Sequence, residues 1–400
     1  MLFLFFVQLG QGMQQVTTNL WLLAMGYPAS WLGRLLAVGA VAGLAGSLPL
    51  GWLGRRWGAE RVFLLSGGLA GLTGAAALLW PRPQPLLAAA VAAGLAGAAL
   101  AVLTNPLMAE LEPPGRASLL FSSAYALSEV ALVLGSLLGG GLPALVGGSH
   151  APAGLRNALL VTLLVSGAAL FPLLRLGRIQ GGEGREGAEP GESARPAPSR
   201  LDGRPGLRTL AVAALLVLVE ALTGAGAGLV VPYLNVFLVR RFGAGTGEVG
   251  TVFALGSVAT ALLALLAGRL AGRGRRRAAW VGIGFELLSL PLLLAAPRTG
   301  SLAAAGVVLV LRSGLMNAAE PLRSQFAMAS VRGAGRTWLS ALQNLAWQAA
   351  WAAATAWAGS WVDRGAFQLL FQWTALAYLL AAGTWSLLAL GTAPERGGAP

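Results

Sequence analysis

Four ionisable side chains interrupt the long apolar runs of this 400-residue chain: Glu129, Glu220, Glu286 and Arg312. Charged groups inside apolar segments are costly, and they often mark a path for ions or small molecules. A buried carboxyl group can take up a proton because burial penalises its charged form. Glu129 and Glu220 lie nearest the middle of their runs, so we predict that one of them carries a proton. The alternative is structural: Arg312 pairs with Glu286 or Glu220, because an unpaired buried arginine would cost far more.

Uncharged polar residues recur at helical spacing in four of the apolar runs, and on a helix each set falls on one face. Four such faces predict a water-filled route where they meet. A buried hydrogen-bonded seam is the competing explanation for any single face. The candidate lining residues are Gln8, Gln11, Gln15, Asn19, Tyr125, Glu129, Glu220, Asn235, Arg312, Asn344, Trp347, Gln348 and Trp351.

The chemistry of these faces points to two kinds of bound molecule. Trp347 and Trp351 are one helical turn apart and could stack on an apolar or cationic compound. The amides favour a hydroxylated solute instead, because they bond hydroxyl groups well. The 13 tryptophans of the chain also fit an interfacial belt with lipid-facing packing.

The composition explains why polar groups are so informative here. Hydrophobic residues make up 56% of the chain and charged residues only 11%, about half of what a soluble domain carries. The chain has no cysteine and a single histidine, His150, so we expect no disulfide, metal site or cofactor. We also expect no enzyme activity, because the acids outside the spans, such as Glu320 and Asp363, have no evident catalytic partners.

The positive charge of the chain suggests a membrane role. The formal charge is +13, but no basic stripe with interleaved aromatics is present, so we expect no nucleic-acid partner. All 28 basic residues are arginine, and without lysine there can be no phosphate-binding G-x-x-x-x-G-K-[ST] loop for ATP.

Apolar runs long enough to cross a bilayer as helices recur along the chain. Because they are continuous rather than alternating, they predict an all-α polytopic membrane protein and not a barrel. The twelve predicted spans are 2–24, 30–53, 61–80, 85–109, 117–140, 156–176, 208–238, 246–270, 278–296, 300–322, 336–361 and 366–390.

The arginines between the spans predict orientation. With the N-terminus inside, 20 arginines fall in cytoplasmic gaps and seven on the opposite side, which favours two cytoplasmic termini in the cell inner (plasma) membrane. Anionic lipid should contact the cytoplasmic arginine loops. Residues 177–207 have almost no apolar content and are predicted to be a flexible cytoplasmic linker. It separates six-helix bundles at 1–176 and 208–390, with a cytoplasmic tail at 391–400.

The two halves repeat. Asparagine, glycine and proline keep one register, as chance apolar similarity would not, so we infer a parallel duplication of a six-helix unit. The matched pairs are Asn19 with Asn235, Gly33 with Gly250, Gly51 with Gly268 and Pro106 with Pro321. In this register the first helix is about nine residues shorter than its partner, so we expect further apolar sequence upstream of Met1 and no signal peptide.

Two arginine loops at the repeat offset resemble the loop motif of the major facilitator superfamily, G-x-x-x-D-[RK]-x-G-[RK]-[RK]. The likeness covers the chain outside the linker, and the loops read Gly51-Trp-Leu-Gly-Arg55-Arg56-Trp-Gly58-Ala-Glu-Arg61 and Gly268-Arg-Leu-Ala-Gly272-Arg273-Gly274-Arg-Arg-Arg277. The resemblance implies two six-helix bundles that rock around a central cavity, with these loops helping to close the inner side. It also implies that helices 1, 4, 7, 10 and 2, 5, 8, 11 line that cavity, whereas 3, 6, 9 and 12 lie outside it. The four polar faces fall on helices 1, 5, 7 and 11, which belong to the lining set.

Both loops depart from the family pattern, since Arg55 and Gly272 stand where an aspartate is expected. In the family this acid helps to latch the outward-open state, so Glu60 or Glu110 would have to substitute here. The fifth run carries Gly135-Ser-Leu-Leu-Gly139-Gly140, which resembles the family's antiporter motif G-P-x-x-G-G. The alternative is that these glycines only allow close helix packing.

From these features we predict a monomeric secondary transporter of a small molecule, with proton-linked export of an amphiphilic compound as the preferred mode. Facilitated or proton-coupled uptake of a polar solute such as a sugar is the alternative. A non-transporting membrane receptor or scaffold is the rival from another class, because the loop motifs are degenerate.

Overall fold

The computed structural model describes residues 1–110, 117–174, 207–272, 274–331 and 335–391. The predicted linker up to residue 206, most of the predicted tail and Arg273 lie outside the described residues. Among the described residues the chain is helical and contains no strand, which confirms the predicted all-α class. The elements are α1 (Leu2–Ala24), α2 (Ala29–Trp57), α3 (Ala59–Leu79), α4 (Pro83–Glu110), α5 (Ala117–Leu145), α6 (Pro152–Ala168), α8 (Leu207–Val230), η2 (Val231–Tyr233), α9 (Leu234–Phe242), α10 (Thr246–Ala271), α11 (Arg275–Ala295), η3 (Ala296–Arg298), α12 (Leu302–Ala318), α13 (Glu320–Ser330), α14 (Gly335–Asp363) and α15 (Phe367–Leu390).

Every predicted span overlaps helix in the described residues. Ten of these segments are long and apolar enough to cross a membrane. The other two, α1 and α14, are 23 and 29 residues long, and they carry the glutamine and asparagine residues that lower their apolar content.

Several helix ends differ from the prediction by a few residues; for example, α5 ends at Leu145 rather than at 140. Two further differences change the elements themselves, and both involve proline. The run 208–238 is not one helix, because Pro232 lies in a short 3-10 turn that separates α8 from α9. The tenth span does not end at 322. Pro321 occupies the first turn of α13, where its missing N–H costs nothing, and the helix continues to Ser330.

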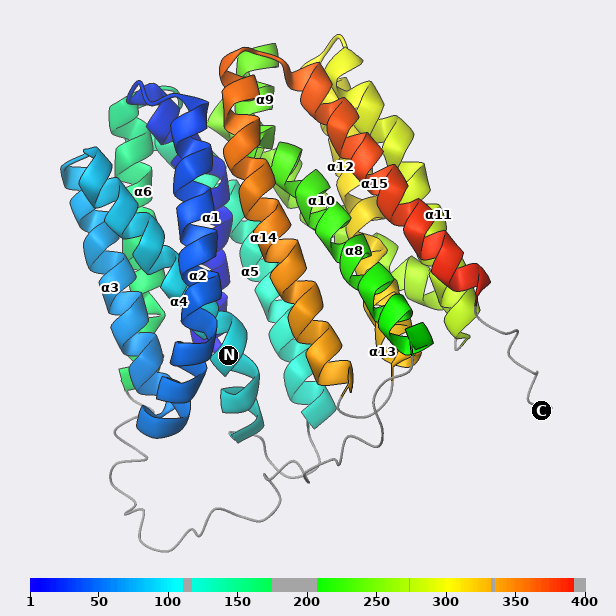
Figure 1. The fold of residues 1–400 in the computed structure, drawn as a ribbon. Coiled ribbons are helices and arrows are strands. Elements are labelled where there is room, and N and C mark those ends of the chain that lie inside the picture. The colour runs from blue at the N-terminus through cyan, green and yellow to red at the C-terminus, as the bar shows by residue number, and fades with distance from the viewer. Residues whose placement is uncertain (111–116, 175–206, 273, 332–334, 392–400) are drawn as a thin grey trace, which may run out of the picture. The chain divides into compact units, whose positions relative to one another are not determined.

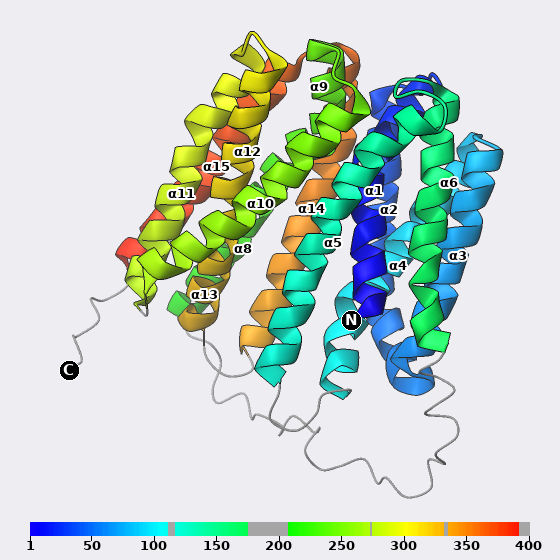
Figure 2. The same cartoon turned by 180° about the vertical axis from the view of Figure 1, so that it is seen from behind.

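The structure divides into two compact units, which are described separately. Among the described residues, unit 1 comprises those within 1–174, 231–257 and 355–367, and unit 2 those within 207–230, 258–354 and 368–391. In unit 1, α1 packs on α5 and α6, and α4 packs on α2 and α3 (Figures 1 and 2). Unit 1 therefore holds α1–α6 together with α9, the start of α10 and the end of α14.

Unit 2 is organised around one apolar core. Leu216, Ile283, Phe326 and Trp385 are buried there, and the Trp385 ring packs on the Cα of Gly282, which has no side chain to obstruct it. The close-packed core of α8, α11, α13 and α15 supports the buried charges described next.

Candidate functional site

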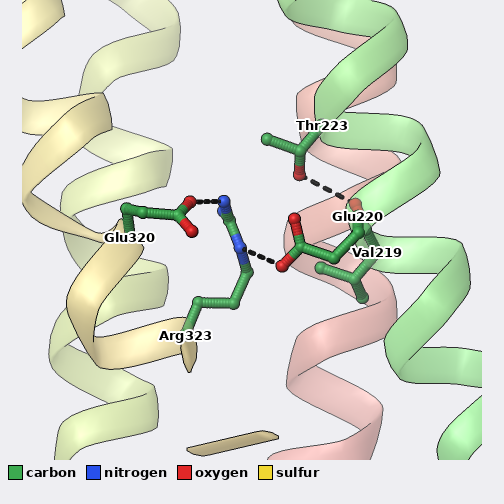
Figure 3. Close-up of polar contacts among 5 residues, drawn as sticks. All are labelled: Val219, Glu220, Thr223, Glu320 and Arg323. Atoms are coloured by element: carbon green, nitrogen blue, oxygen red, sulfur yellow. Dashed lines mark hydrogen bonds and ion pairs between the residues drawn. The ribbon is translucent and has the colours of Figure 1, made fainter. Parts of the chain in front are cut away.

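The strongest polar cluster of unit 2 centres on Arg323. Its Nε donates to Glu220 Oε1 at 3.0 Å, and its Nη2 donates to Glu320 (Figure 3). The side chains of Arg323 and Glu220 are only 3% and 11% exposed, whereas that of Glu320 is 57% exposed. One buried guanidinium therefore joins α8 to the first turn of α13, and Glu320 connects the pair to the surface of unit 2.

Glu286, on α11, belongs to the same cluster. Glu286 is fully buried, and within the described part of the chain neither of its carboxyl oxygens has a hydrogen-bond partner. The charges of Glu220, Glu286 and Glu320 all act on Arg323. Unit 2 thus gathers three carboxyl groups around one guanidinium, which gives this cation more than one possible partner.

Arg312 does not pair with Glu286 or Glu220 among the described residues, so the predicted ion pair is wrong. Its Nη2 donates to the Tyr378 hydroxyl at 3.0 Å, and its guanidinium lies 5.5 Å from the centre of that ring. The cation is held by an aromatic ring and its hydroxyl. Arg323 has the predicted role instead.

Sequence reasoning missed Arg323 because it placed this residue in a cytoplasmic gap beyond the tenth span. Two signals could have identified it. Pro321 is suited to a helix start, and Glu320 and Arg323 are three residues apart, as in a helical ion pair.

The other predicted residues of unit 2 lie along α14. Trp347 and Trp351 are stacked, with ring centres 6.3 Å apart and planes inclined by 13°. Trp347 and Gln348 are half-buried and Asn344 is exposed. A Cβ on Gly224 would contact the backbone of Trp347, so this turn of α14 lies against α8, one helical turn from Glu220.

In unit 1 the amides of α1 take part in contacts with three other elements, α5, η2 and α9. Gln15 donates to the Ser136 hydroxyl on α5 at 2.7 Å. Asn19 donates to the Pro232 carbonyl and lies 3.4 Å from the Asn235 side-chain oxygen. The buried Asn235 amide in turn donates to the carbonyls of Gln15 and Val16, both at 3.2 Å. The repeat-related asparagines therefore meet in the structure.

The rest of the α1 face is more open. Gln11 is exposed and Gln8 half-buried on the same helix. On α5, Tyr125 and Glu129 interact one helical turn apart, and Tyr125 is 65% exposed. Glu129 belongs to unit 1 and Glu220 to unit 2.

A second contact in unit 1 involves Asp363 at the end of α14. Its carboxylate accepts from the backbone N–H groups of Ala29 at 2.6 Å and Ser30 at 3.0 Å. These are free donors at the start of α2, where the helix dipole favours a negative charge. Nearby, Arg240 of α9 donates to the Val362 carbonyl at 2.7 Å. The end of α14 is therefore tied to both α2 and α9.

The Asp363 contact can be tested by an isosteric substitution. Asp363→Asn should reduce the free energy of unfolding by about 1 kcal/mol, because it removes the charge that complements the two N–H groups. The measurement is thermal unfolding in detergent. Arg364→Gln, at the exposed neighbouring residue, is the control, and an equal loss in both variants would contradict the assignment.

The first predicted gating loop forms a tight turn between α2 and α3. Gly58 has φ +89, a conformation that favours glycine. Arg55, Arg56 and Arg61 are exposed, and the Arg56 guanidinium lies 5.3 Å from the centre of the Trp52 ring. Gly51 is buried in α2. No ion pair of Glu60 occurs within the described residues, and the side chain of Glu110 lies outside them.

The second loop joins α10 to α11. Gly268 lies in α10 with open space at its Cα, and Gly274 caps the N-terminus of α11. Arg275 donates to the Ala329 carbonyl at 3.2 Å and lies over the Phe326 ring. The loop is therefore held to the end of α13, the helix that carries Arg323.

The glycines of the antiporter-like motif pack helices closely, as the alternative interpretation predicted. A Cβ on Gly135 would contact the Leu9 carbonyl, and one on Gly139 would lie 2.6 Å from the Met13 Cα. Gly140 makes the equivalent approach to Thr246 and Gly250 at the start of α10. These positions let backbones meet without intervening side chains.

Comparison with known proteins gives a consistent family assignment. The Major Facilitator Superfamily model matches residues 1–355. No curated protein matches the chain. A variant of the nucleoside transporter NupG is 14% identical, with a TM-score of 0.75, over 97% of this chain and 98% of that one.

Two further solved structures have the same architecture. A bacterial homologue of the human lysosomal transporter Spinster is 15% identical, with a TM-score of 0.71, over 96% of each chain. A D-xylose–proton symporter is 16% identical, with a TM-score of 0.66, over 98% of this chain and 97% of that one. At these identities the likeness concerns the fold. Within the described residues, no group of three or more His, Cys, Asp or Glu residues is placed to hold a metal ion.

Proposed function

Because this chain belongs to the major facilitator superfamily, we propose that it moves a small molecule across the membrane by alternating access, with proton-linked export of an amphiphilic compound. The bodies that rock are the two sequence halves, residues 1–176 and 208–390. Both termini are cytoplasmic in the inner membrane, the protein works as a monomer, and anionic lipid binds its arginine loops.

The observation that carries proton coupling is the buried ion pair between Glu220 and Arg323. If Glu220 takes up a proton, it loses the charge that holds Arg323 Nε, and the guanidinium is left with Glu320 and Glu286. Arg323 is therefore either paired with Glu220 or paired with another acid. Arrangements between these two states are disfavoured because they leave a buried charge uncompensated, which is costly. Proton uptake can therefore bias the packing of α8 against α13.

The stacked pair Trp347–Trp351 supports an amphiphilic substrate with an aromatic or cationic part. Trp347 lies against Gly224 of α8, which is one helical turn from Glu220. The alternative is uptake of a polar solute. It is favoured by the exposed amides of Gln11 and Asn344, and structural relatives include a nucleoside transporter and a D-xylose–proton symporter.

The coupling residue can be identified in proteoliposomes. A thermal-shift panel of amphiphilic cations and hydroxylated solutes supplies the transported probe. With a pH gradient, Glu220→Gln should reduce accumulation at least tenfold while exchange of the probe at equal concentrations continues, because glutamine cannot release a proton. Glu129→Gln tests the partly covered acid of α5 in the same assay.

Glu248→Gln is the control, since Glu248 is exposed and accepts from the Gly245 N–H in its own helix turn. Unchanged gradient-driven transport in the Glu129→Gln, Glu220→Gln double variant would exclude both acids. Absence of any flux in the wild-type protein, despite ligand binding, would instead favour a receptor or scaffold.

A further inference from the structure

The cluster around Arg323 contains donors and acceptors that the ion pair with Glu220 does not use. Arg323 Nη1 is buried without a partner among the described residues, and so is Arg312 Nε. Those two nitrogens are donors. The two carboxyl oxygens of Glu286 are possible acceptors, and they too are buried without a hydrogen-bond partner in the described part of the chain. Trp385 Nε1 is a fifth such atom in the described part of unit 2. Buried polar atoms are nearly always bonded, so five unused ones in one unit require an explanation.

The surroundings of Glu286 are charged on several sides. Arg323 and Glu320 act on it from α13 and Glu220 acts on it from α8. Glu286 also acts on Tyr378 of α15, which is bonded to Arg312 of α12. The residue is fully buried, so bulk water does not neutralise a charge there.

In this arrangement an ionised Glu286 would be a buried anion with no donor, next to two other carboxylates and one guanidinium that is already paired. That state is costly. A carboxylic acid in the same place is neutral and needs far less compensation. The unused Nη1 of Arg323 is the donor that an ionised Glu286 would require.

We propose that Glu286 is a proton-binding site and the second partner of Arg323. In the arrangement seen here Glu286 holds a proton and Arg323 is paired with Glu220. When the Glu286 O–H bond breaks, the proton leaves through the half-exposed Glu320 to water, and Arg323 turns Nη1 to the new carboxylate. The O–H electron pair stays on Glu286, so the step needs no co-reactant.

Infrared difference spectroscopy of the purified full chain tests the protonation without any substrate. Spectra collected at acid and alkaline pH in H2O and D2O should contain the band of a protonated, buried carboxylic acid. Glu286→Gln should remove that band, because glutamine has the same shape and no ionisable proton. Glu248→Gln, at an acid of unit 1 that is open to solvent, should leave it.

Glu286→Asp gives a second measurement that does not depend on how well the glutamine variant folds. It should retain a carboxylic acid band and shift its position, because the shorter side chain changes the environment of the carboxyl group. A band that persists unchanged in both Glu286 variants would overturn the proposal, as would its loss in Glu248→Gln alone.

The coupling role of this site rests on the proposed function, and the two fail differently. If wild-type flux ignores a pH gradient but Glu286→Gln loses the band, proton-linked transport is wrong and the protonation site stands. If wild-type flux follows the gradient and the band persists in Glu286→Gln, transport stands and this inference is wrong.

Discussion

Replacing Arg323 by methionine should lower the free energy of unfolding by on the order of 3–5 kcal/mol and abolish transport. The Arg323 side chain is only 3% exposed, and it is the described partner of Glu220. Methionine fills similar volume but leaves Glu220 as a buried, uncompensated charge. Thermal unfolding in one detergent, followed by fluorescence-detected gel filtration, measures the loss.

Two comparisons separate the charge from the packing. Glu220→Leu in the Arg323→Met background should recover much of the stability, because removing both partners of a buried pair costs less than removing one. Arg298→Met is the single-charge control in the same unit, since Arg298 is in the short turn after α11 and bonds the nearby Leu294 carbonyl. Additive losses in the double variant would contradict the pair.

Substituting Gly139 should have the second largest effect, through the close approach of α5 to α1. Its Cβ would lie 2.6 Å from Met13 Cα and 2.7 Å from the Met13 carbonyl oxygen. Those are backbone atoms, so the neighbouring helix must move as a whole. We expect Gly139→Val to cost about 1–3 kcal/mol or more, as overpacking does.

Gly141, two residues along the same helix, is the matched control because a Cβ added there would meet no described atom within 4 Å. Gly141→Ala should be neutral or should stabilise by up to about 0.5–1 kcal/mol, since alanine favours a helix over glycine. Thermal unfolding of Gly139→Ala and Gly141→Ala compares the same chemical change at both sites. Equal shifts would show that the α1–α5 contact does not limit stability.

Much of this fold was predictable because the bilayer permits so few structures. Apolar runs of this length can satisfy their backbone groups only as helices. Every predicted span overlaps helix in the described residues, although the chain breaks at Pro232 and between α12 and α13. The repeat was also predictable from the sequence, because Asn19 matches Asn235 at nearly the same spacing as the glycine and proline pairs. The sequence also indicated that polar groups inside these spans were the ones to examine.

What the sequence could not provide was which groups meet. In the sequence, Arg323 lies two residues after a proline and before polar residues, as a loop cation would. In the structure it belongs to α13, and the packing of that helix buries it. Its partner Glu220 is 103 residues away, and nothing in local spacing selects that acid over Glu286. The tertiary structure decided the pairing, because the energy of a buried charge depends on the atoms packed around it rather than on its neighbours in the chain.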